Sequence, residues 1–160
     1  MGKKQPRTRD KEKAMSPENT TRLIKDFPIL YPSMREDKTP WGMFRSFDCG
    51  DGWFELVRDL SEKLEDVLRA LPEDERFGVT QVKEKFGGLR FYVGGVPHEV
   101  FDLVQGMIRE AEGQSLRTCE VTGKPGRLRT KRGWDQTLCD EVAAEEGWET
   151  VEEEASYTWP

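Results

Sequence analysis

Several features are scarce in this chain of 160 residues. No apolar run approaches the roughly 18 residues of a membrane-spanning helix, and the polar N-terminus has no apolar signal-peptide core. Only three cysteines occur, an odd number at irregular spacing, which argues against a secreted disulfide framework. We therefore expect a cytoplasmic protein with reduced thiols and no membrane partner.

Signals of catalysis are also few. The single histidine, His98, lies near the start of an expected helix, where a capping or surface role is commoner than general-base catalysis. No Ser, Cys or Asp is placed by the sequence to complete a triad with it. Asp48 and Asp51 in "DCGDGW" are the one candidate pair for catalysis, but paired aspartates before a helix usually act as caps. We expect no enzyme, no catalytic residue and no cofactor.

The net charge of −6 conceals strong segregation. Residues 1–22 and 116–132 are rich in Lys and Arg, whereas residues 140–154 contain eight acids and no base. Such blocks are most often solvated tails or faces, and they sometimes bind partners. We predict a disordered basic tail over 1–22, one compact domain over 23–148, and an acidic tail over 149–160.

Two helices are expected from apolar spacing. In "DGWFELVRDLSEKLEDVLRALP", Asp51 is the expected N-cap, and apolar residues from Trp53 to Leu71 recur at steps of three and four. Charged residues, Glu65 among them, form the expected outer face. The second helix, "VPHEVFDLVQGMIREAEG", has Pro97 in its first turn, Phe101 in its apolar stripe and Gly113 at its end. Residues 22–34 favour an irregular extended segment, and residues 35–50 a packed loop.

"VTQVKEKFGGLRFYV" predicts a β-hairpin with a two-residue turn at Gly87-Gly88. That register pairs Phe86 with Leu89 and Lys83 with Tyr92, whereas a three-residue loop with a bulge would move these partners by one. One face is then core, formed by Val82, Phe86, Leu89, Phe91 and Val93, and the other presents Lys83, Lys85, Arg90 and Tyr92. Glu84 points toward the apolar face, where we expect an edge position or an ion pair rather than a functional carboxylate.

The last third contains half of a zinc-binding pattern. Cys119 and Thr122 have the spacing of a zinc knuckle, as do Cys139 and Val142, and sixteen residues separate the two pairs. Two thiolates do not complete a tetrahedral structural site. We predict no bound metal, with Cys119 and Cys139 left as vestigial positions close to each other.

These pieces predict an α+β fold: an antiparallel hairpin packed by two helices, followed by a ribbon- or treble-clef-like subdomain at about 115–148. The chain resembles a family of small proteins from tailed bacteriophages and prophages, through "CGDGWFELVRDL", "QVKEKFGGLRFYV", "CE..GKPG" and "GW..TLCDE" over roughly residues 47 to 145. The resemblance implies a phage-encoded accessory protein and supplies no catalytic residues. It also implies a zinc ligand set from which this sequence departs at Thr122 and Val142.

The favoured function is therefore non-enzymatic binding and modulation of a host macromolecule, with a host protein as the expected partner and inhibition of host defence as one form. The alternatives are a nucleic-acid-binding module and a nucleotide-sequestering protein. The aromatic and cationic pattern of the hairpin and of "RLRTKRGW" favours nucleic acid, whereas a pI of about 5.0 argues against it. The expected partner-binding residues are Lys83, Lys85, Arg90, Tyr92, Arg127, Arg129, Lys131 and Arg132.

Overall fold

The computed structural model describes residues 14–31 and 46–151. Two units follow one another along the chain. The larger contains α2 (Pro17–Asp26), β1 (Phe47–Asp48), the 3-10 turn η2 (Asp51–Trp53), α3 (Phe54–Arg69), the 3-10 turn η3 (Glu73–Glu75), β2 (Gly78–Lys85), β3 (Gly88–Gly94) and α4 (His98–Ser115). The smaller contains β4 (Arg127–Lys131), β5 (Trp134–Leu138), α5 (Asp140–Glu146) and β6 (Glu149–Thr150).

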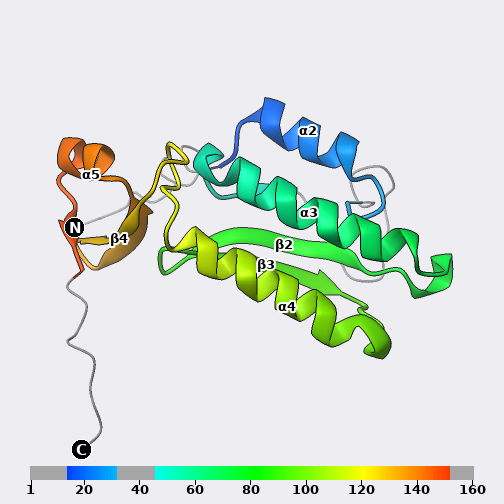
Figure 1. The fold of residues 1–160 in the computed structure, drawn as a ribbon. Coiled ribbons are helices and arrows are strands. Elements are labelled where there is room, and N and C mark those ends of the chain that lie inside the picture. Colours follow the sequence, from blue (N-terminus) through cyan, green and yellow to red (C-terminus); the bar gives the residue numbers. More distant parts are fainter. Residues whose placement is uncertain (1–13, 32–45, 152–160) are drawn as a thin grey trace, which may run out of the picture.

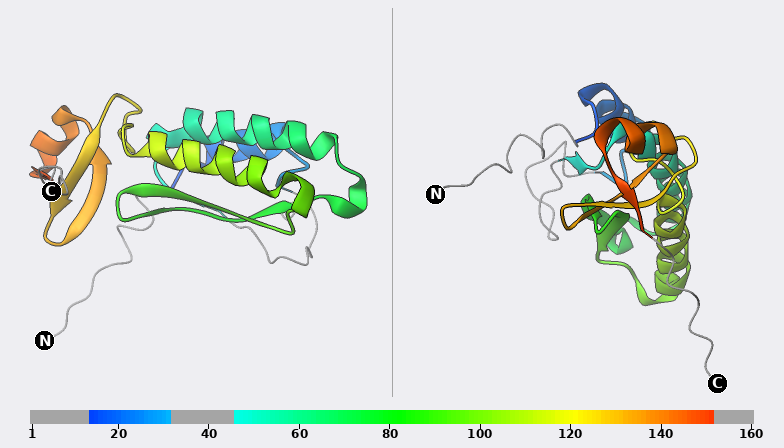
Figure 2. Two further views of the ribbon diagram at one scale, coloured as in Figure 1. Left: turned by 60° about the horizontal axis from the view of Figure 1, so that its bottom comes forward. Right: turned by 90° about the vertical axis from the view of Figure 1, so that its left-hand side faces the viewer.

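The larger unit is a two-layer structure (Figures 1 and 2). Its sheet has the order β1-β2-β3, in which β1 is parallel to β2 and β2 is antiparallel to β3. α3 and α4 lie side by side over one face of this sheet, and α2 packs on the far side of α3. The core between the layers contains Trp53, Leu64, Val82, Leu89 and Ile108. The predicted α+β class is confirmed.

The predicted disordered tail, residues 1–22, overlaps a helix of the structure and is therefore too long. Residues 17–26 form α2, whose N-cap is Ser16, with its side chain accepting a hydrogen bond from the Asn19 N–H. Met15 and Leu23 are buried in the main core. The low apolar content of residues 1–22 concealed this short helix, because one capped turn and two buried side chains suffice when a neighbouring helix supplies the surface. Residues 1–13 lie outside the described part.

The segment after α2 is held by polar residues of α3. The carboxylate of Glu65 accepts hydrogen bonds from the N–H groups of Ile29 and Leu30, and the hydroxyl groups of Tyr31 and Ser61 lie 2.7 Å apart. The prediction that Glu65 faces solvent is therefore wrong: it is 1% exposed. The predicted extended segment at 22–34 is helical up to Asp26, and most of the predicted loop at 35–50 lies outside the described residues.

The α3 stripe is largely as predicted, but its start differs. Trp53 is the N-cap residue of α3, and no side chain caps this end. The carboxylate of Asp51 instead accepts hydrogen bonds from the Ser16 N–H and the Asn19 side chain, which fixes the start of α2 against the larger unit.

The β2–β3 hairpin turns one residue earlier than predicted. Phe86 and Gly87 have φ values of 55° and 83°, as a type I′ turn requires, so Lys83 pairs with Arg90 and Val82 pairs with Phe91. Every partner moves by two positions, and the faces are therefore preserved. Lys83, Lys85, Arg90 and Tyr92 do share one face, but Phe86 belongs to the turn and is 70% exposed.

α4 runs to Ser115, two residues beyond the predicted end, and Pro97 is its N-cap rather than a member of its first turn. Val104 and Ile108 are buried as expected, whereas Phe101 is 47% exposed. Within the described residues, none of the helices combines the length and apolar character needed to cross a lipid bilayer.

The smaller unit has its own sheet, of order β5-β4-β6, and its own small core. That core is formed by Cys119, Leu138, Cys139, Val142, Ala143 and Trp148. Glu149 and Thr150 pair with β4, so the predicted acidic tail begins inside the fold. The chain order of turn, hairpin and helix is visible in Figure 1, and a zinc-ribbon origin of this unit stays a prediction.

Trp53 connects the two units and provides a test of the fold. It is fully buried, and its indole N–H donates to the carbonyl of Thr118. Trp53→Ala is expected to lower the free energy of unfolding by about 3–5 kcal/mol, because a large cavity and an unpaired carbonyl remain. Urea denaturation followed by circular dichroism measures the effect. Trp134→Ala is the matched control, since Trp134 is 63% exposed, and equal losses in both variants would contradict this packing.

Candidate partner-binding cleft

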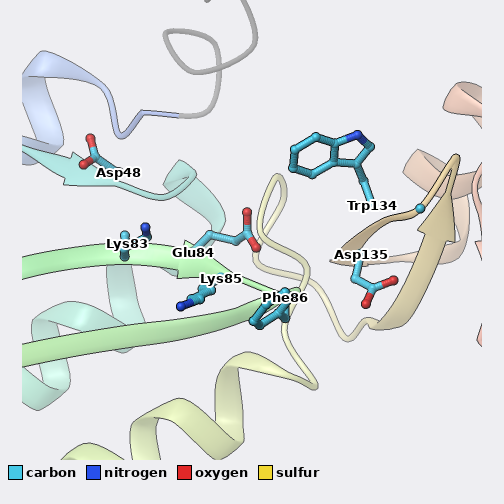
Figure 3. A pocket seen from close by; sticks show the side chains of 8 residues that line it. Asp48, Lys83, Glu84, Lys85, Phe86, Trp134 and Asp135 are labelled. Atoms are coloured by element: carbon cyan, nitrogen blue, oxygen red, sulfur yellow. The ribbon is translucent and has the colours of Figure 1, made fainter. Parts of the chain in front are cut away.

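A cleft of about 620 Å³ lies between the tips of the two hairpins (Figure 3). The β2–β3 hairpin supplies one wall, β5 with its preceding turn supplies the other, and β1 contributes at the edge. The lining residues are Asp48, Lys83, Glu84, Lys85, Phe86, Gly133, Trp134 and Asp135. Both aromatic side chains are largely exposed, with Phe86 at 70% and Trp134 at 63%.

The two hairpins are held together behind the cleft. The hydroxyl of Thr137 on β5 donates to the carbonyl of Gly87 at 2.7 Å, and both groups are buried. Gly87 packs so closely against β4 that a Cβ at this position would lie 2.4 Å from the Leu128 side chain. The tip of the β2–β3 hairpin is therefore fixed on the smaller unit.

Glu120 makes the second connection between the units. This residue is 1% exposed, and its carboxylate accepts hydrogen bonds from the Gly50 N–H and from the Gln136 side chain. Its carbonyl accepts a third from the Gly52 N–H at 2.8 Å. A buried carboxylate with several donors around it is well compensated for its loss of hydration.

The glycines of "CGDGW" permit this approach. A Cβ on Gly50 would lie 2.4 Å from the Glu120 carbonyl oxygen, and one on Gly52 would lie 2.2 Å from that of Cys119. Both contacts are with backbone, which has no room to move. The "CGDGW" motif therefore forms part of the contact with the smaller unit.

Phe86 is held in an unusual backbone conformation. Its φ of 55° is the left-handed region, which a bulky residue rarely occupies, and its ring has little burial to offset that strain. The Lys85 ammonium lies 5.4 Å from the ring centroid. The turn conformation thus presents an aromatic ring at the mouth of the cleft.

The charges of the cleft are mixed. Lys83 stands opposite Asp48 in the parallel register, and one carboxylate oxygen of Glu84 accepts the Gly87 N–H at 2.9 Å. Glu84 therefore caps the turn locally, and its predicted edge position or ion pair with an arginine stays a prediction. With Lys85 and Asp135 included, the lining holds two cations and three acids.

Only part of the predicted cationic face of the β2–β3 hairpin is free to contact a partner. Lys83, Lys85 and Tyr92 lie on the outer side of the sheet, and Tyr92 is 43% exposed. Arg90 turns toward α4, where its guanidinium lies 3.8 Å from the Glu112 carboxylate. Partial burial raises the pKa of Glu112, and the nearby Arg90 counteracts part of that rise.

Of the basic residues in β4 and the turn that follows it, some are held by contacts within the smaller unit and others are exposed. Arg129 is 6% exposed and bonds Asp140, Thr150 and the carbonyl of Leu138, so its predicted role in partner binding is wrong. The alternation of β4 places Arg129 on the buried side of the strand, where its hydrogen bond and its charge lower the pKa of Asp140. Lys131 donates to the Glu146 carbonyl and lies near the Trp148 ring. Arg127 and Arg132 are exposed.

The two knuckle-spaced pairs converge. The Thr122 N–H donates to the Cys119 sulfur at 3.4 Å, and the Thr122 hydroxyl approaches the Cys139 sulfur at 3.6 Å. Val142 is buried in the small core. In the described ranges, 14–31 and 46–151, no cluster of three or more His, Cys, Asp or Glu side chains is arranged to hold a metal ion.

The remaining polar candidates have structural or surface positions. His98 is exposed at the first residue of α4. Partial burial alone would raise the pKa of Asp51, but its hydrogen bonds with Ser16 and Asn19 outweigh that effect and lower the pKa. Asp48 lies at the edge of the cleft.

Sequence reasoning missed Phe86 and Trp134 as a pair. The sequence predicts a core position for Phe86, and for Trp134 a place in a basic stretch or among the apolar residues that support the knuckle turn. The available signal was the repeated pattern of a bulky residue followed by glycine between two strands, in Phe86-Gly87 and Arg132-Gly133, because both are type I′ turns.

Comparison with known proteins gives no neighbour: no family model, curated protein or solved structure matches this chain.

Gly52→Ala tests the joint between the units. The added methyl group would overlap the backbone of Cys119 and Glu120, so the variant is expected to lose several kcal/mol of stability or to separate the smaller unit from the larger. Limited proteolysis and thermal melting measure both results. Gly106→Ala on α4 is the control, because nothing lies within 4 Å of its added Cβ and helix propensity predicts stabilisation of about 1 kcal/mol. A Gly52→Ala protein as stable as wild type would refute the close contact.

Proposed function

We propose that this chain is a non-enzymatic binding protein that docks a protein partner in the cleft between its two hairpin tips. The observation that carries the proposal is Phe86, a strained residue with an exposed ring. Strain of this kind persists where the surrounding structure enforces it, and it concentrates at functional sites. Asn or Gly at this turn position would relieve the strain and would support folding better.

The aromatic pair suits a protein interface. Phe86 and Trp134 come from different units and border one cleft, and Tyr92 follows on the adjoining sheet face. Aromatic side chains of this type supply most of the binding energy at the centre of protein interfaces. Because the cleft walls are fixed by Thr137 and Glu120, little ordering would be needed on binding.

The charge pattern favours a protein partner over nucleic acid. A groove that follows a phosphate backbone is lined by cations, whereas this cleft combines two lysines with three acids. Arg129 is buried, and Arg90 is close to Glu112, which weakens the cationic surface expected from the sequence. The matching partner segment carries an apolar anchor flanked by charges of both signs.

The sequence resemblance to phage and prophage proteins supports a host macromolecule as that partner. Under this proposal the protein alters the partner's activity by occupying its surface, and inhibition of a host defence protein is one such effect. No catalytic step is needed.

Site-specific photo-crosslinking tests the proposal directly. A benzoylphenylalanine is placed at position 86, or at position 101 as a control, in protein expressed in the organism that encodes it. The exposed Phe101 on α4 lies outside the cleft lining. We expect one dominant crosslinked protein from position 86 only. Crosslinks to nucleic acid would favour the nucleic-acid alternative, and equal products from both positions would reject the cleft.

A stability and affinity comparison gives the second test. Phe86→Asn is expected to raise the free energy of unfolding by about 1 kcal/mol, since asparagine tolerates positive φ. The same change is expected to weaken binding of the crosslinked partner by about thirtyfold, because an aromatic anchor is lost. Calorimetry with the purified partner measures the affinity.

Arg132→Asn is the matched control at the equivalent turn position, where φ is 52°. It relieves the same kind of strain without removing an aromatic ring from the cleft. It is expected to stabilise the fold similarly and to change the affinity little. If Phe86→Asn binds as tightly as wild type, the cleft is not the docking site.

A further inference from the structure

The three cysteines occupy different chemical environments. Cys49 is fully buried in the main core, and this burial, with nearby Glu120 and other acids, raises the pKa of its thiol well above the ordinary value. Cys139 is surrounded by hydrogen-bond donors, beginning with the Val142 N–H and including the Thr122 hydroxyl, and these lower its pKa. Cys119 lies near enough to contribute to the lowered pKa of Cys139, and Thr122 contacts the sulfurs of both residues.

A cation completes the surroundings of the sulfur pair. The Lys124 ammonium is 3.0 Å from the Glu141 carboxylate, and it also interacts electrostatically with Cys139 and Cys119. Thr122 contacts both sulfurs, through its backbone N–H and its hydroxyl. The site thus holds two sulfurs that share Thr122 as a contact, N–H and O–H donors, and the Lys124–Glu141 ion pair.

We propose that Cys139 and Cys119 form a dithiol site that exchanges with low-molecular-weight disulfides, such as glutathione disulfide, and closes a Cys119–Cys139 disulfide. Cys139 is the attacking residue, and Cys119 is the resolving residue. The proposal is independent of the partner-binding cleft, because neither sulfur lines it.

The reaction has two steps. The Cys139 thiolate attacks one sulfur of glutathione disulfide, the disulfide bond of that molecule breaks, and one glutathione thiolate leaves and takes up a proton. Cys119 then loses its proton and attacks the Cys139 sulfur of the mixed disulfide, which expels the second glutathione. The protein loses two electrons and two protons, and one glutathione disulfide becomes two glutathione thiols.

The geometry explains this order of attack. Donors gathered on the Cys139 sulfur stabilise its thiolate, which is the nucleophilic form. Cys139 is 5% exposed whereas Cys119 is completely buried, so an incoming disulfide meets Cys139 first. Cys49 lies in the main core, away from this small one, and is expected to remain a thiol.

The test incubates the full-length protein, with a chelator present, in glutathione disulfide at pH 7 and maps the products by mass spectrometry of its peptides. Wild type is expected to give a Cys119–Cys139 disulfide with Cys49 unmodified. Cys119→Ser is expected to accumulate glutathione on Cys139, because the resolving thiol is missing. Cys139→Ser is expected to give neither product.

Thr122→Val supplies a matched control for the surroundings of Cys139. It removes the hydroxyl donor while keeping a similar shape, and it is expected to slow alkylation of Cys139 by iodoacetamide about threefold or more at pH 7. Circular dichroism establishes that each variant is folded. Equal modification of all three cysteines in folded wild type, or glutathione on Cys119 in Cys139→Ser at the wild-type rate, would overturn the proposal. Failure to form the disulfide in folded wild type would do the same.

Discussion

The contact between Gly50–Trp53 and Thr118–Glu120 determines how the rest of this structure is arranged. Three donors of the first segment, the N–H groups of Gly50 and Gly52 and the indole of Trp53, are satisfied by acceptors of the second. The approach is possible only because two glycines leave room for the opposing backbone. Since Trp53 also belongs to the main core, the same few residues begin α3, fill the core and dock the smaller unit. A substitution at one of these glycines would therefore disturb both units.

This joint gives the cleft its rigidity. The Glu120 carboxylate reaches Gln136 on β5, and Thr137 on the same strand holds the carbonyl of Gly87. The two hairpin tips are consequently fixed relative to each other by buried hydrogen bonds. Phe86 and Trp134 lie at the hairpin tips, where their side chains are exposed and line the cleft. Binding to a surface formed by two hairpins that are already fixed loses less conformational entropy than binding to a loop. We therefore regard this surface as the strongest binding candidate.

Apolar periodicity in the sequence predicts which faces of the helices and strands are buried. It does not predict features that depend on a single tertiary contact. The α3 stripe and the faces of the β2–β3 hairpin follow from spacing alone, because every second or every third to fourth residue must be buried. The register of the hairpin and the burial of Glu65 and Arg129 do not follow from spacing. Phe86 is a turn residue because Val82 pairs with Phe91 instead of Val93, which leaves Phe86 and Gly87 between the two strands. Glu65 and Arg129 are charged residues whose partners, Leu30 and Asp140 among them, are placed by the tertiary fold. The cleft itself was not predictable, since its walls come from segments that the sequence does not connect.

In the smaller unit, side-chain contacts hold the two residue pairs that have knuckle spacing. Val142 contributes to a compact core with Leu138 and Trp148, and Thr122 binds both sulfurs through its N–H and hydroxyl groups. Arg129 adds a buried network that joins β4 to the end of β5, to α5 and to β6. These contacts are local and dispersed, so each stabilises a small part of the unit. The unit is attached to the larger one through Glu120, which lies next to Cys119 in the chain, and through the bonds of Trp53 and Thr137. The turn that begins at Cys119 and the contact made by Glu120 are therefore formed by neighbouring residues of the same segment.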